Sequence, residues 1–293
     1  MSVQSRSSRQ SSFSRPSRSS HRARLAGLAA AALVLLPGIA SAADGVALAK
    51  AKSLGPHLSA FPRISDADAS GLGDDGVSKI NAALAKADAR VEAAASECRD
   101  QAKDAGSLDE NGGGWERSVN VTWNGPGFLS FLVTDSYYCG GAYPSEESFP
   151  LVFDFATGSP VNWARYLPAS LMGKATLESA SDGTRLGVVS SPALVKLYLG
   201  GYVSAANAVA TASDSPALDA ESVKECEDVI TDSLQGQSFV IWPQANPVGL
   251  AVMPLGLPHA IAACGVAVVI PPAKLKSLGA KPAFLDALAG GAE

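Results

Sequence analysis

Apolar side chains recur at steps of three and four between Asp74 and about Lys103, the spacing of one face of an α-helix. A stripe of this length predicts a long amphipathic helix whose apolar face packs on a core. Asp74 or Asp75 stands where this helix begins, and either can cap it. We expect Cys98 on the buried face near the end. The stripe comprises Val77, Ile80, Leu84, Ala87, Val91, Ala94 and Cys98.

The period of the pattern changes to two after the Asn111-Gly-Gly-Gly114 run. In the first strand of this region, Trp115 and Trp123 are expected on the same face. Successive strands joined by short turns predict an antiparallel meander over residues 115–167. Its strands are expected at Trp115–Trp123, Phe128–Tyr138, Phe149–Phe155 and Val161–Leu167.

The rest of the chain alternates helical spacing with short apolar runs. Helices are expected at Pro168–Ser179, Pro192–Ala210 and Asp219–Leu234, followed by two short helices at the end of the chain. Strands are expected at Ser238–Trp242, Val248–Met253 and Ile261–Ile270, which together make a hairpin region over 238–270. Segregated helices and antiparallel strands indicate an α+β fold.

The first 42 residues differ from everything that follows them. Six arginines and no acidic residue precede the apolar run Leu25–Leu36, and the small residues Ala40-Ser-Ala-Ala43 come next. This order is typical of a cleaved signal peptide, with cleavage after Ala42. The alternative is a membrane anchor, but the run is shorter than the roughly 20 residues that span a bilayer. We therefore expect a periplasmic or secreted protein without a stable membrane anchor. Residues 43–293 would form one α+β domain, or two subdomains at about 57–167 and 168–293.

Cleavage would make the exported chain strongly acidic. It removes six of the 23 Lys and Arg residues and none of the 28 Asp and Glu residues, leaving 17 against 28, a formal net charge of −11. Nucleic acids and anionic membrane surfaces need a basic footprint, so neither is expected as a partner. An acidic surface is compatible with a cationic partner.

All four cysteines lie after the signal peptide. An even number in an exported chain predicts two disulfide bonds. Four cysteines leave three connectivities open. The order of the elements favours Cys98 with Cys139, which bracket the first helix and hairpin, and Cys226 with Cys264, which bracket the last ones.

Motifs for catalysis and cofactor binding are missing from the sequence. The exported chain has two histidines far apart, His57 and His259, and no HExxH or CxxC motif, so we expect no metal. It contains no GxSxG or SxxK nucleophile motif, and paired cysteines provide no thiol. The glycine run 111–114 joins a helix to a strand, which is the reverse of a phosphate loop. We expect no cofactor and assign no catalytic residue.

Carboxylates near residue 150 are the remaining candidates for chemistry. Glu146 and Glu147 are expected in a loop, and Asp154 at the end of a strand. Glycoside hydrolysis needs two acids on one sugar, whereas adjacent residues of an extended backbone point to opposite sides. Asp154 in the Asp-Phe-Ala-Thr-Gly sequence is better interpreted as a turn residue that accepts backbone N–H groups.

Two stretches resemble a known family. Tyr138-Cys-Gly-Gly-Ala-Tyr-Pro144 and Phe153-Asp-Phe-Ala-Thr-Gly158 are similar to the Y-x-G-G-A-H-P … F-D-x-x-T-G signature of the RsiV-type extracytoplasmic domain. That domain occurs in lysozyme-sensing anti-sigma factors and beside some peptidoglycan deacetylases. The resemblance covers about residues 57–280 and implies an α+β domain that binds lysozyme in its best-understood member. Tyr143 stands where the family often has histidine.

The region around Cys139 is therefore the candidate binding surface. Glycines 140 and 141 allow a bulge or a close approach of backbone, and aromatic rings beside acids are typical of partner anchors. The alternative is that the tyrosines merely cover a sheet edge. We predict a binding or interaction module, not an enzyme, for a cationic protein such as lysozyme or for a cell-wall component. The alternative function is a hydrolase of peptidoglycan or an ester that uses His259, Asp154 and Glu147. The binding candidates are Tyr137, Tyr138, Tyr143, Glu146 and Glu147.

Overall fold

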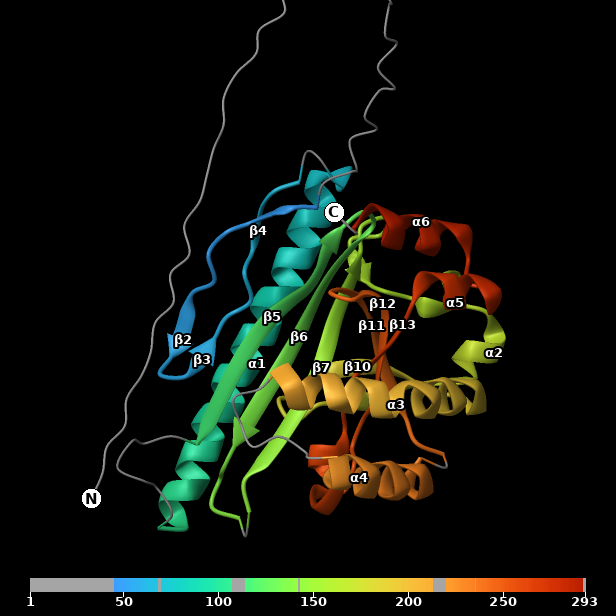
Figure 1. Ribbon diagram of the computed structural model, residues 1–293. Helices are drawn as coiled ribbons and strands as arrows, with labels where there is room; N and C mark the ends of the chain where they lie inside the picture. The colour runs from blue at the N-terminus through green and yellow to red at the C-terminus, as the bar shows by residue number, and fades with distance from the viewer. Residues whose placement is uncertain are drawn as a thin grey trace, which may run out of the picture. The chain divides into compact units, whose positions relative to one another are not determined.

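The computed structural model describes residues 45–67, 70–106, 114–141, 143–212, 220–234 and 236–291 (Figure 1). The predicted signal peptide lies outside these residues. Among the helices described, none combines the length and the apolar character that crossing a bilayer requires. Helices and antiparallel sheets form separate runs along the chain, so the predicted α+β class is confirmed.

Helix α1 spans Asp74–Asp104 and confirms the longest predicted element. Its N-cap is Gly73, which has no capping side chain, so the predicted cap at Asp74 or Asp75 is wrong. Both acids lie in the first turn instead, where a negative charge favours the helix dipole. The buried face carries Ile80, Leu84, Ala87, Asp88, Val91, Ala95, Cys98 and Ala102.

A six-stranded sheet in the order β2-β3-β5-β6-β7-β8 contains the predicted meander. Strands β5, β6 and β7 are long and antiparallel, and β3 joins β5 in parallel. In Figure 1, α1 runs behind β5. The strands are β2 (Ser53–Gly55), β3 (Leu58–Ser59), β5 (Trp115–Gly125), β6 (Phe128–Tyr137), β7 (Ser145–Asp154) and β8 (Ser159–Pro160). A separate pair joins β1 (Ala47–Leu48) to β4 (Ile64–Asp66).

A β-bulge in β5 changes which face its residues share. Val121 pairs with Phe131, whereas Trp123 pairs with Ser130, so the pairing shifts by one residue between them. Neighbouring residues of β6 point to opposite faces, and Trp123 therefore leaves the face of Trp115. The prediction that both tryptophans lie on one face is wrong for this reason.

The end of the meander also differs from the prediction. Instead of a strand over Val161–Leu167, the chain makes only β8 and then the 3-10 helix η2 (Trp163–Arg165). Asn162 caps this helix by accepting a hydrogen bond from the amide of Ala164 at 3.2 Å. A local side-chain bond of this kind competes with strand pairing.

A five-stranded sheet in the order β13-β12-β11-β10-β9 holds the rest of the core. Strand β11 contacts β5, β6 and β7, so the two large sheets pack on each other. The predicted helix over Pro168–Ser179 is wrong beyond α2 (Ala169–Met172), because strand β9 follows it. The predicted strand Ile261–Ile270 is wrong at its start, where the chain forms the 3-10 helix η3 (His259–Cys264). The strands are β9 (Lys174–Ser179), β10 (Arg185–Ser190), β11 (Phe239–Ala245), β12 (Val248–Pro254) and β13 (Val268–Ile270).

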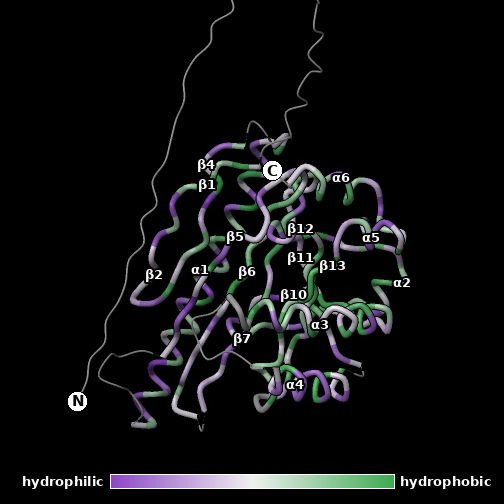
Figure 2. Tube along the Cα trace, in the orientation of Figure 1, coloured by the Kyte–Doolittle hydropathy of each residue, from purple (hydrophilic) through white to green (hydrophobic). Residues whose placement is uncertain are grey.

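Four more helices occur in the second half of the chain and agree with the sequence prediction. Helix α3 packs on β12 and β13, where Tyr198 donates its hydroxyl hydrogen to the carbonyl of Val266 at 2.9 Å. Strands β11 to β13 are mostly hydrophobic, as the green segments of Figure 2 show. The helices are α3 (Pro192–Ala212), α4 (Ala220–Ser233), α5 (Pro272–Ser277) and α6 (Pro282–Gly290).

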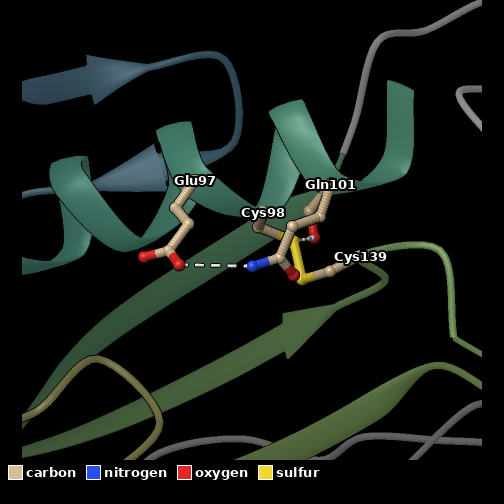
Figure 3. The surroundings of a disulfide bond; sticks show 5 residues. Glu97, Cys98, Gln101 and Cys139 are labelled. Carbon is tan, nitrogen blue, oxygen red and sulfur yellow. Dashed lines mark hydrogen bonds between the residues drawn. A yellow bond between two sulfur atoms is a disulfide. The ribbon is translucent and has the colours of Figure 1, made fainter. Parts of the chain in front are cut away.

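Both predicted disulfide bonds are present. Cys98 of α1 is joined to Cys139, and Cys226 of α4 is joined to Cys264 of η3. Figure 3 shows the first bond, which ties the C-terminal part of α1 to the chain just after β6. Disulfide bonds persist in oxidising compartments, so the pairing of all four cysteines indicates an extracytoplasmic location.

Candidate functional site

The five predicted binding residues occupy the end of β6, the loop after it and the start of β7. Tyr137 ends β6, and Tyr138 and Tyr143 lie in the loop. Glu146 and Glu147 belong to β7, so the prediction that they lie in a loop is wrong. Strand pairing with β6 extends to Ser145 and includes both glutamates.

Two of the tyrosines contribute to the packing of this end of the sheet. The ring of Tyr137 stacks on Trp115, with 4.5 Å between centroids and 14° between planes. Trp115 in turn packs on Val91 and Cys98 of α1. The amide of Tyr138 donates to the carbonyl of Gly114 at 2.8 Å. The ring of Tyr137, which the sequence analysis considered for binding, thus belongs partly to the packing of the sheet, and it also lines a cavity.

We name this the β7 hollow: a cavity of about 670 Å³ lined by residues 144–148 and residues 253–257, and also by Ala262, Ala263 and Gly265. Of the predicted site residues, it brings together Tyr137, Glu146 and Glu147. Tyr138 and Tyr143 do not line it. The Tyr143 side chain is 71% exposed in the neighbouring loop.

The two glutamates have different environments in the β7 hollow. Glu146 pairs with Ser136 and Glu147 with Asp135, so their side chains leave opposite faces of the strand. The carboxylate of Glu147 accepts a hydrogen bond from the amide of Ser181 at 2.7 Å. Glu146 is exposed. Glu147 therefore holds the β9–β10 turn, whereas the side chain of Glu146 is open to solvent.

The opposite wall of the β7 hollow was missed by sequence reasoning. Met253, Leu255 and Leu257 provide apolar surface there, at the end of β12 and in the segment after it. The run Pro254-Leu-Gly-Leu-Pro258 marks a turn, but only the tertiary fold places that turn beside β7.

A buried ion cluster fixes the β9–β10 turn behind the site. Arg117 of β5 donates to Asp135 of β6 at 2.6 and 2.5 Å and to Asp182 of the turn at 2.8 Å. The side chains in both ion pairs are 0% exposed. Burial alone would lower the pKa of Arg117, but the two carboxylates outweigh it and raise the pKa above its ordinary value.

Asp154 lies at the other end of β7 and serves the fold. Its carboxylate accepts hydrogen bonds from the amide of Ala156 at 2.8 Å and from the hydroxyl of Tyr166 at 2.8 Å, which confirms the predicted turn role. Burial, then the bond to Asp154, raises the pKa of Tyr166 to about 12. Seven strand residues at roughly 3.4 Å each put Asp154 more than about 20 Å from Glu147 along β7.

Two of the acids considered for a reactive site, Asp154 and Glu147, do not come together in the structure. The residues proposed for a hydrolase are divided, because Asp154 and Glu147 occupy opposite ends of β7. His259 begins η3, and its side chain lies outside the described part of the structure. Among the residues described, no group of three or more His, Cys, Asp and Glu side chains is placed to hold a metal ion.

Comparison with solved structures gives a weak likeness. No family model matches the chain, and no curated protein matches it. The chain is similar to a crystal structure of a DUF3298 family member from Bacteroides fragilis NCTC 9343, with a TM-score of 0.40 and 12% identity, covering 84% of this chain and 98% of that chain. A similarity of this size carries no argument about function, and the RsiV-type resemblance stays a prediction.

Proposed function

We propose that this protein is an extracytoplasmic binding module that catalyses no reaction, and that its β7 hollow binds a cationic group of the partner. The location is supported by the two disulfide bonds. The choice of surface is supported by a cavity in which three of the predicted site residues meet.

The observation that carries this proposal is the pairing of an exposed carboxylate with an apolar wall. Glu146 lies on one side of the β7 hollow, and Met253, Leu255 and Leu257 lie on the other. An amphipathic cation covers apolar surface with its carbon stem or ring while its charged end reaches a carboxylate. The acidity of the exported chain adds long-range attraction for such a partner.

Lysozyme is the cationic protein that the RsiV-type resemblance implies as a partner. The test is size-exclusion chromatography of the exported protein with lysozyme at about 0.05 M and about 0.5 M salt, since screening weakens exposed charge pairs. We expect co-elution at low salt that is lost at high salt. Glu146→Gln should weaken it by about tenfold. Glu225→Gln removes an exposed charge from α4 and is the matched control.

Two results would contradict the proposed function. If the Glu146 and Glu225 variants lose lysozyme binding equally, the interaction depends only on the net charge of the protein and not on the β7 hollow. Failure of lysozyme and of a purified cell-wall fraction to bind at either salt concentration would leave the hollow without a cationic partner.

The alternative function, hydrolysis of peptidoglycan or an ester, has lost part of its proposed site. Asp154 is buried and bonded at the far end of β7, so it is not available to act with Glu147. A turnover assay on fluorescent peptidoglycan decides between the two functions. Activity that disappears in a folded His259→Ala variant would replace the binding proposal with a catalytic one.

A further inference from the structure

A second cavity lies beside the β7 hollow on the same sheet. We name it the β3 hollow; its volume is about 590 Å³, and it extends from the β2–β3 hairpin across β5 to β6. Most of its lining residues are polar or charged, in contrast to Met253, Leu255 and Leu257 of the β7 hollow. Lining residues include Lys52, His57, Glu116, Ser118, Thr134 and Ser136.

The two hollows are neighbours that share a residue. Ser136 lines both of them. Thr134 of the β3 hollow and Ser148 of the β7 hollow are joined by a hydrogen bond of 2.9 Å between their hydroxyl oxygens. From β2 to β7 the sheet has four inter-strand intervals, which at roughly 4.8 Å each span about 20 Å. We call the stretch of sheet that lines both hollows the trough.

Strand register arranges the floor of this trough in two rows. Directly paired residues share a face, so Glu116, Ser136 and Glu146 form one row across β5, β6 and β7. Ser118, Thr134 and Ser148 form the next row. The exposed carboxylates of Glu116 and Glu146 thus flank a serine, and their backbones are about 10 Å apart because one strand lies between them.

The floor is suited to a sugar chain. Its central strand β6 is paired with both neighbours, so a ligand at this place meets side chains and not a strand edge. Short hydroxyl side chains leave room for pyranose rings and exchange hydrogen bonds with sugar hydroxyls. The carboxylates of Glu116 and Glu146 favour a sugar chain that carries positive charges.

We propose that the trough formed by both hollows binds an oligosaccharide that carries free amino groups, with ammonium groups at Glu116 and Glu146. This inference rests on the proposed function, because Glu146 is shared, and it extends the site to Glu116. Lys52 lies at the far end, where it opposes a cationic ligand.

The experiment is calorimetric titration of the exported protein with a glucosamine pentamer, with the N-acetylglucosamine pentamer as the uncharged partner of equal length. We expect saturable binding of the glucosamine pentamer and at least about tenfold weaker binding of the acetylated one, the size expected for a charged hydrogen bond. Glu116→Gln should weaken the glucosamine pentamer about tenfold, and Lys52→Gln should strengthen it. Both side chains are exposed, so we expect both variants to fold.

The outcomes separate this inference from the proposed function. Binding of lysozyme that depends on Glu146, without binding of the glucosamine pentamer, overturns the sugar inference and leaves the proposed function standing. Equal affinity for the two pentamers, or no effect of Glu116→Gln, also overturns it. Loss of every interaction in the Glu146 variant but not in the Glu116 variant confines the site to the β7 hollow.

Discussion

Gly140 is a residue whose identity the fold dictates. It has φ of +89°, and a Cβ atom at this position would lie 2.7 Å from the Cβ of Ala105 at the end of α1. The close approach that the sequence predicted is therefore real, but it is made by the helix. Nothing within 4 Å restricts a Cβ at Gly141.

Gly140→Ala tests this difference between the two glycines. A left-handed backbone and the contact with Ala105 should together lower the free energy of unfolding by at least about 1 kcal/mol. Gly141→Ala is the matched control and should change it by less than about 0.5 kcal/mol. Urea unfolding of both variants measures the difference, and equal effects would contradict the account.

Arg117 supplies the positive charge of the buried cluster. Arg117→Met leaves Asp135 and Asp182 buried without a cation, and we expect a loss of about 3–5 kcal/mol in the free energy of unfolding. Lys79→Met breaks the exposed pair with Asp75 and should cost less than about 0.5 kcal/mol. A loss of similar size in both variants would show that the cluster contributes little.

At the residue scale the sequence located part of the site. Tyr137, Glu146 and Glu147 were found because aromatic and acidic residues gather beside a cysteine and two glycines. Met253 and Leu255 could not be recognised in this way, since an apolar residue at the end of a strand is equally compatible with a place in the hydrophobic core. Glu116 and Ser136 were missed because their alignment with Glu146 depends on strand register.

At the scale of elements, long periodic segments were predictable and short irregular ones were not. Helix α1 and strands β5 to β7 have clear apolar periods. The sequence alternation in β5 continues through the bulge, so it gives no sign that Trp123 changes face. Strand β9 is an edge strand, and most of its residues are exposed. It therefore carries no apolar alternation from which it could have been recognised.

The contact between η2 and β7 predicts a response to alkaline pH. The pKa of Tyr166 rises from 10.0 in the unfolded chain to about 12 in the fold. Above pH 10 the unfolded chain loses this proton first, so the free energy of unfolding falls between about pH 10 and 12. Tyr166→Phe should make that fall shallower and cost about 1 kcal/mol at neutral pH. An unchanged slope in urea titrations would contradict it.

For the whole molecule, we expect the two disulfide bonds to make a large contribution to the free energy of unfolding. They close segments of 41 and 38 residues. The chain-entropy model gives about 4 kcal/mol for each. The double variant Cys226→Ser, Cys264→Ser should lose about that amount in urea unfolding. If reduction of the unmodified protein leaves its unfolding midpoint unchanged, the bonds are not needed for stability.

Export is tested on the same scale by the mass of the protein recovered outside the cytoplasm. We expect a chain that begins at Ala43, because cleavage after Ala42 follows the small-residue pattern. Recovery of the chain with residues 1–42 attached would refute the signal-peptide prediction. It would also restore six arginines and weaken the argument from net charge.

The central claim is that the β7 hollow is the surface where this protein meets a cationic partner. Hydrogen exchange followed by mass spectrometry, with and without lysozyme or the glucosamine pentamer, tests it most directly. The account predicts slower exchange in residues 136–148 and 253–257 when either of them binds. Protection confined to other segments, such as α3 and α4, or binding with no protection around the β7 hollow, would contradict it.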